Sequence, residues 1–140
     1  MTTGEVLEII GSLVSALKAY CAKLPAVVHL SMIPGGVKPT PEVVEAYEQA
    51  VYRFRTQSAP TPFRKLTELF IESLEAFEAG KALATVQPLL AVLDHLEQMQ
   101  RDKEIQVTVA EEKRFGDYRQ TLYKIMPGNQ PELEGAGRGL

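Results

Sequence analysis

The chain has 140 residues, of which 45% are hydrophobic and 24% are charged, and its formal net charge is −3. This length suits one domain with a buried core, and the acidic balance argues against sequence-independent binding to nucleic acid or acidic lipid. The single cysteine, Cys21, excludes a disulfide or a multi-cysteine zinc site within these residues.

The first predicted helix covers residues 3–24. A capping box of Thr2 and Glu5 marks its start, and Pro25 marks its end or a kink. Its apolar stripe is broader than one neighbouring helix covers, so we expect part of it to contact a partner or a second copy. The candidate interface residues are Val6, Ile9, Ile10, Leu13, Val14 and Leu17.

The first residues lack the positive charges of a secretory signal, and no apolar run approaches the length that spans a bilayer. We therefore expect a cytoplasmic protein without a membrane span. The most apolar stretch, residues 24–33, predicts a buried connection or a short extra helix. A lone strand is set aside, because no second strand-like run could pair with it.

Two threonine–proline pairs predict the next two helix starts. Thr40–Pro41 and Thr61–Pro62 each place a capping hydroxyl before a proline at the first helical position. We expect helices over residues 41–57 and 62–79. Gly80 follows the second of these, where a left-handed C-terminal cap favours glycine.

The third helix carries an acidic stripe. Glu68, Glu72, Glu75 and Glu78 are spaced by four, three and three residues, which places them on adjoining turns, and the first three are the candidate docking residues. The stripe is interpreted either as a solvated face, relieved by Arg64 and Lys65 one turn upstream, or as a docking face for a basic partner.

The last two helices are predicted over residues 82–104 and 109–126. Pro88 is unfavourable inside a helix, so we expect Thr85 to cap a fresh start there, or the helix to kink. Thr108 and Glu111 form a second capping box. Gly116 should weaken the last helix by about 1 kcal/mol relative to Ala, unless a close neighbour needs the space.

Five helices with short connections predict an all-α, compact antiparallel bundle over residues 1–126. Leu69, Leu93 and Leu122 are expected in its core. The Gly-rich tail, residues 127–140, has almost nothing to bury, so we expect it to be flexible unless a partner holds it.

Residues for catalysis or metal binding do not form a recognisable pattern. The two histidines, His29 and His95, lack the Glu-x-x-His spacing of di-iron bundles. Cys21 lies on the apolar side of its helix, which predicts a small buried hydrophobe rather than a nucleophile. Glycine spacing fits no phosphate-binding loop. We expect no cofactor, no metal and no enzymatic activity.

A basic cluster with neighbouring aromatic residues provides a weak candidate for nucleic-acid binding. Two of its members cannot share one helix face, because Arg53 and Arg55 are about 200° apart. Positive charge at a helix end also complements the helix dipole. The candidate residues are Arg53, Arg55, Arg64 and Lys65.

An acidic helical protein with several amphipathic faces and no catalytic pattern is expected to act by binding other proteins. The leading hypothesis is a non-enzymatic interaction module: an adaptor, an assembly chaperone or a small subunit of a larger complex. The alternatives are a structural component of a large particle, such as a virion or a tail, and a small helical subunit of a nucleoprotein complex. Nucleic-acid binding is the least favoured of these.

Overall fold

The computed structural model describes residues 1–22 and 39–125 of the chain. Within these two ranges it contains five α-helices, one short 3-10 helix and no strand, which confirms the expected all-α bundle. In chain order the elements are α1 (Thr3–Ala22), α2 (Pro41–Ser58), η2 (Pro62–Leu66), α3 (Thr67–Glu78), α4 (Ala82–Arg101) and α5 (Val109–Ile125). The expectations for residues 23–38 and 126–140 lie outside the described residues.

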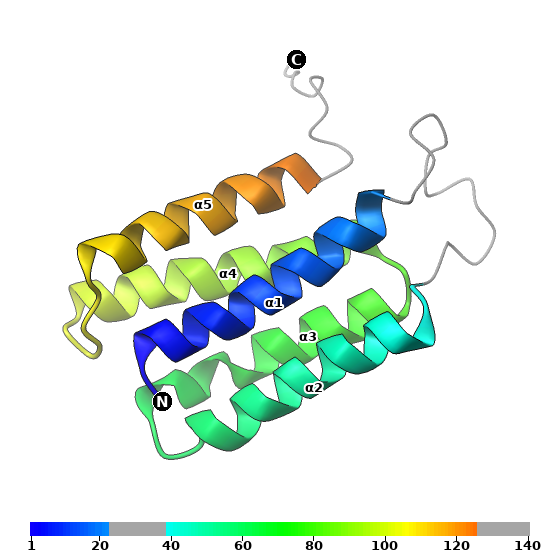
Figure 1. Cartoon of the computed structure of the whole chain (residues 1–140). Helices are drawn as coiled ribbons and strands as arrows, with labels where there is room; N and C mark the ends of the chain where they lie inside the picture. Colours follow the sequence, from blue (N-terminus) through cyan, green and yellow to red (C-terminus); the bar gives the residue numbers. More distant parts are fainter. Residues whose placement is uncertain (23–38, 126–140) are drawn as a thin grey trace.

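Consecutive helices run antiparallel, and α1 packs beside both α2 and α5 (Figure 1). Because α1 and α5 are first and last in an alternating order, they are parallel neighbours. Two close approaches show the register: a Cβ on Gly4 would lie 3.3 Å from Glu111 Oε2, and one on Gly11 would lie 2.6 Å from Tyr118 Oη. The parallel contact between α1 and α5 therefore closes the antiparallel bundle.

Both expected capping boxes are present, and each opens one of the two parallel helices. At α1 the Glu5 N–H donates to Thr2 Oγ1 at 3.2 Å, and the Thr2 N–H donates to Glu5 Oε1 at 2.7 Å. At α5 the Glu111 N–H donates to Thr108 Oγ1 at 3.1 Å, and the Thr108 N–H donates to Glu111 Oε1 at 2.9 Å. These reciprocal bonds satisfy donors that a helix leaves unpaired at its start.

The two threonine–proline pairs also begin helices, although the second begins differently from the expectation. Thr40 Oγ1 accepts from the Val43 N–H at 3.4 Å, and Pro41 is the first residue of α2. Thr61 Oγ1 accepts from the Phe63 N–H at 3.2 Å, but Pro62–Leu66 forms the 3-10 helix η2 before the α-helix starts at Thr67. The expected single helix over 62–79 is therefore two elements.

Both α3 and α4 end in a Schellman motif. After α3, Gly80 has φ of 73°, and the Lys81 N–H donates to the Ala76 carbonyl at 2.9 Å. After α4, Lys103 has φ of 62°, and the Glu104 N–H donates to the Met99 carbonyl at 2.9 Å. In each motif the residue with positive φ reverses the direction of the chain. The glycine cap expected after α3 is therefore confirmed, and α4 ends before the expected residue 104.

The expected fresh helix start capped by Thr85 is wrong. Helix α4 continues through this residue, and Thr85 lies inside the helix, where its Oγ1 donates to the Lys81 carbonyl at 2.8 Å. Pro88 is itself buried. Its packing between neighbouring helices offsets part of the cost of a proline inside a helix.

Aromatic side chains fill the part of the core between α1, α2 and α3. Phe77 stacks on Tyr47 with ring centroids 4.5 Å apart, and it forms an edge-to-face pair with Tyr20 at a centroid distance of 5.6 Å. The buried Tyr47 hydroxyl donates to Ser73 Oγ at 2.8 Å, and that hydroxyl donates to the Phe70 carbonyl at 2.7 Å. The buried hydroxyls of Tyr47 and Ser73 therefore both have a partner, as burial of polar groups demands.

Two of the three leucines expected in the core are there. Leu93 and Leu122 are fully buried, whereas Leu69 is only half-buried at the junction of α3 and α4. The expectation for Leu69 as a fully buried core residue is wrong, because α3 turns this side chain toward a groove.

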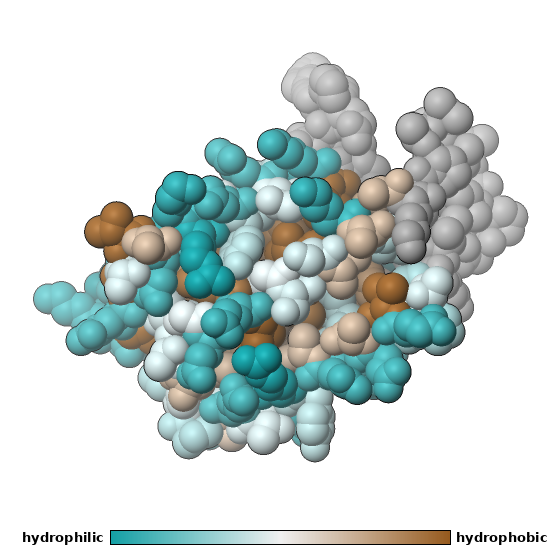
Figure 2. All heavy atoms as spheres, in the orientation of Figure 1, coloured by the Kyte–Doolittle hydropathy of each residue, from teal (hydrophilic) through white to brown (hydrophobic). Residues whose placement is uncertain are grey.

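On the face shown in Figure 2, hydrophobic residues occur in small separate areas among hydrophilic ones.

Candidate functional site

An open groove of about 560 Å³ lies between α3 and α4 on the described surface. These are the two helices with the most extensive mutual contact. The apolar lining residues are Leu69, Ala76, Ala79, Ala84, Pro88 and Ala91, and the polar ones are Glu72, Glu75, Lys81 and Gln87. Four of these ten side chains are alanine methyl groups, which leave space between the helices.

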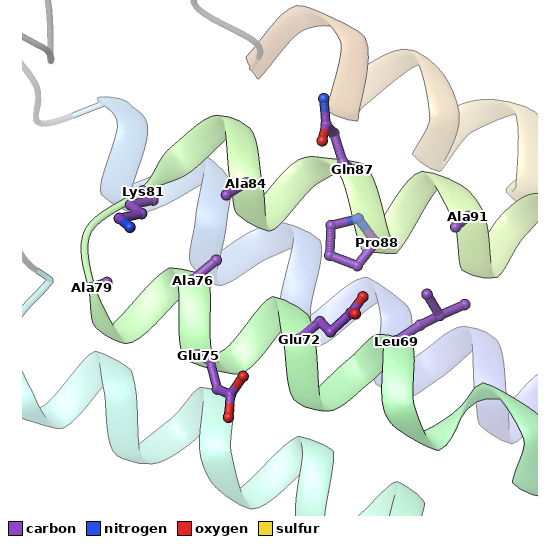
Figure 3. A pocket seen from close by; sticks show the side chains of 10 residues that line it. All are labelled: Leu69, Glu72, Glu75, Ala76, Ala79, Lys81, Ala84, Gln87, Pro88 and Ala91. Atoms are coloured by element: carbon purple, nitrogen blue, oxygen red, sulfur yellow. The ribbon is translucent and has the colours of Figure 1, made fainter.

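Apolar and charged side chains occupy different parts of the groove. In Figure 3, Leu69 and Pro88 lie between the two helices, and Glu72 extends from α3 into the space beside them. Glu75 leaves α3 on the side away from α4, and Lys81 lies at the end where the two helices join. The negative charges therefore belong to the α3 edge, and one positive charge marks the closed end.

The acidic stripe expected from the sequence is partly assembled at this groove. Glu72 and Glu75 line it, whereas Glu68 is exposed and does not. Among the described residues, neither Glu72 nor Glu75 makes an ion pair. Lys65 does not relieve the stripe, because it pairs with Glu104 at 2.7 Å.

Pro88 also changes the backbone at the groove. Proline has no N–H, so the Ala84 carbonyl, four residues earlier, cannot receive its ordinary helix hydrogen bond. Ala84 is exposed and lines the groove. Its carbonyl therefore lacks the helix hydrogen bond that a residue other than proline at position 88 would donate. The sequence identified Pro88 only as the place of a fresh helix start or a kink, so this consequence was missed.

The interface expected on the first helix is not at the surface. All six candidate residues are buried within the chain, with exposed fractions of 0–4%: Val6, Ile9, Ile10, Leu13, Val14 and Leu17. The stripe is broad because α1 packs against α2 and α5 and also touches α4. The expectation that it leaves apolar surface for a partner is therefore wrong: the chain's own helices use that surface.

The basic candidates for nucleic-acid binding are all exposed, but two of them face carboxylates. Arg53 lies 3.9 Å from Glu8, and Lys65 lies 2.7 Å from Glu104. Arg55 and Arg64 are exposed without an ion pair among the described residues. Paired cations are less available to phosphate groups, so the described structure does not assemble these four residues into one free basic surface.

Candidate nucleophiles and metal ligands do not come together in the described part of the chain. Burial raises the pKa of the Cys21 thiol to about 11, so the thiolate is scarce near neutral pH. His95 is exposed on α4, and His29 lies outside the described residues. Within residues 1–22 and 39–125, no three side chains of His, Cys, Asp or Glu are grouped closely enough to hold a metal ion.

A second hollow, of about 430 Å³, lies where the starts of α1 and η2 meet the connection between α4 and α5. Its polar groups are largely engaged within the chain. Thr3 Oγ1 donates to the Gln106 carbonyl at 2.8 Å, Glu104 pairs with Lys65, and Glu111 belongs to the capping box of α5. This hollow therefore offers a ligand fewer unused hydrogen-bonding groups than the α3–α4 groove.

Comparison with known proteins adds no functional assignment. No family model, curated protein or solved structure matches this chain. Among the described helices, none combines the length and the apolar character needed to cross a bilayer. The function of the chain is therefore argued from the α3–α4 groove itself.

Proposed function

We propose that this chain is a non-enzymatic protein-interaction module that binds a basic segment of a partner protein in the α3–α4 groove. The role fits an adaptor, an assembly chaperone or a small subunit of a larger complex. The supporting observation is the combination of an apolar floor with two carboxylates, Glu72 and Glu75, that have no ion-pair partner among the described residues.

Charge complementarity selects the partner's chemistry. Apolar side chains of the partner lose contact with water on the floor, which supplies binding free energy. Lysine or arginine side chains beside that floor meet the two carboxylates, and these pairs favour the correct partner over acidic ones. A groove lined only by alanines would not discriminate between partners by charge.

Site-specific photo-crosslinking tests the proposal. A photoreactive amino acid replaces Ala84, which lines the groove, or Ala46, which is an equally exposed alanine on α2 and does not line it. In extracts of the native host, the variant at position 84 should form a discrete adduct with a second protein, and the variant at position 46 should not.

A charge-neutralising variant adds specificity to this test. Glu72→Gln with Glu75→Gln should reduce the adduct at position 84. Glu42→Gln with Glu45→Gln, which has the same spacing on the exposed surface of α2, should leave it unchanged. Equal labelling at positions 84 and 46, or an adduct indifferent to Glu72 and Glu75, would contradict the proposal.

A further inference from the structure

The walls of the α3–α4 groove limit the conformation of whatever binds there. Both walls are helices, and the backbone groups of a helix are largely used within it. A bound extended strand would find no sheet edge with which to pair its own N–H and C=O groups. A bound helix satisfies its backbone internally and needs only side-chain contacts.

The length of the groove matches a short helix. Its lining runs from Leu69 to Ala79 along α3 and from Lys81 to Ala91 along α4. The first and last residues of each span are ten positions apart, which corresponds to about 15 Å at the rise of an α-helix, so the groove accommodates about three helical turns. The alanine methyl groups of the floor let large apolar side chains of a third helix enter between the two walls.

The charges specify how such a helix would be oriented around its axis and along the groove. Glu72 and Glu75 are one turn apart on the α3 edge, so the bound helix would place lysine or arginine at a spacing of three or four on that side. Lys81 stands at the closed end, where the two helices join. The end of the bound helix that lies there would be neutral or acidic.

We infer that the occupant of the α3–α4 groove is an amphipathic basic helix of about three turns, with its positive residues along the α3 edge and away from Lys81. This inference rests on the proposed function and adds the conformation and orientation of the partner. It differs from binding of a basic extended segment, which the same carboxylates would also attract.

Synthetic peptides provide the first test. One peptide of about twelve residues carries leucines at the spacing of one helix face and lysines along one flank. A second peptide has the same sequence except that a proline replaces one central residue, and a third has glutamates in place of the lysines. Fluorescence anisotropy with the full chain measures the dissociation constant of each.

The helical basic peptide should bind at least tenfold more tightly than either control peptide. Glu72→Gln with Glu75→Gln should weaken it about three- to tenfold, as expected for the loss of two exposed ion pairs, and Glu42→Gln with Glu45→Gln should leave it unchanged. Filling the groove by Ala84→Phe should abolish binding, whereas the matched Ala46→Phe should not. Equal affinity for the basic helical and proline-containing peptides, or for the two glutamine double variants, would overturn the inference.

The photo-crosslinked adduct separates this inference from the proposed function. Mass spectrometry of the adduct at position 84 identifies the attached segment of the partner. A segment with a basic amphipathic helical pattern supports both statements. A basic segment with prolines or without a helical pattern would retain the proposed function and overturn the helix, and the absence of any adduct would overturn both.

Discussion

Glycine residues illustrate how one residue type has opposite effects at two positions. A Cβ on Gly11 would lie 2.6 Å from Tyr118 Oη, so the missing side chain permits the close contact between α1 and α5. Gly116 is exposed on α5, and a Cβ there would meet nothing within 4 Å. At Gly116 the missing side chain therefore brings only the entropic cost of glycine in a helix.

Alanine substitutions at these two glycines should therefore change the free energy of unfolding in different ways. Gly116→Ala should raise the free energy of unfolding by about 0.5–1 kcal/mol, because it restores helix propensity without a clash. Gly11→Ala gains the same propensity but displaces the Tyr118 hydroxyl. The double variant Gly11→Ala/Tyr118→Phe should therefore be more stable than the sum of its two single changes predicts.

Urea unfolding followed by circular dichroism measures all four variants. Additive effects of Gly11→Ala and Tyr118→Phe would contradict the close approach of the Tyr118 hydroxyl to α1. A destabilising Gly116→Ala would contradict the open space around that position.

At the scale of the elements, the helices owe their starts to local sequence and their ends to single backbone conformations. The capping boxes need only residues three apart, and each formed where the sequence placed it. The end of α4 depends instead on Lys103, which adopts a left-handed conformation that usually favours glycine. A lysine carries no signal for this conformation, so the sequence predicted that α4 continues to residue 104.

The two Schellman motifs yield a paired prediction. Lys103→Gly should raise the free energy of unfolding by about 1 kcal/mol, because glycine adopts positive φ without the steric cost that lysine incurs. Gly80→Ala should lower it by about the same amount for the same reason. Thermal unfolding of both variants measures the effect.

Lys18→Gly serves as the control for this pair, since Lys18 is an exposed lysine inside α1. Glycine should destabilise the chain there, by about 1 kcal/mol. A Lys103→Gly variant that behaves like Lys18→Gly would contradict the left-handed cap.

At the scale of the whole molecule, α1 and α5 close the bundle, and α5 is also joined to α4. Arg119 on α5 pairs with Glu97 at 2.9 Å and with Asp94 at 2.6 Å, and its hydrogen bond to Glu97 raises the pKa of its guanidinium. Leu122, one turn further along α5, is fully buried. The last helix thus combines polar contacts at the surface with an apolar anchor inside.

Three leucine substitutions test which leucine side chains lie in the core and which one lies at the groove. Leu93→Ala and Leu122→Ala should each lower the free energy of unfolding by about 2–5 kcal/mol, as full burial implies. Leu69→Ala should cost less than either, because this side chain is already partly in water at the groove. Chemical denaturation measures the three values, and a cost for Leu69→Ala equal to that for Leu93→Ala would contradict its placement.

The sequence by itself determined the class of the fold and most helix starts. Apolar residues at three- and four-residue spacing, threonine caps and Thr–Pro pairs are local features, so they act before distant parts of the chain meet. The acidic stripe of α3 was equally visible, because residues three and four apart necessarily share a helix face. The groove beside that stripe was not visible, since Ala84, Pro88 and Ala91 of its lining belong to another helix, α4.

The tertiary structure decided where each apolar face is buried. The stripe of α1 indicates apolar surface for more than one neighbour, but it cannot distinguish a partner protein from the chain's own last helix. That distinction depends on the contact between Gly11 and Tyr118, which are 107 positions apart in the sequence. Contacts over such separations depend on the packing of all helices together, so no local pattern records them.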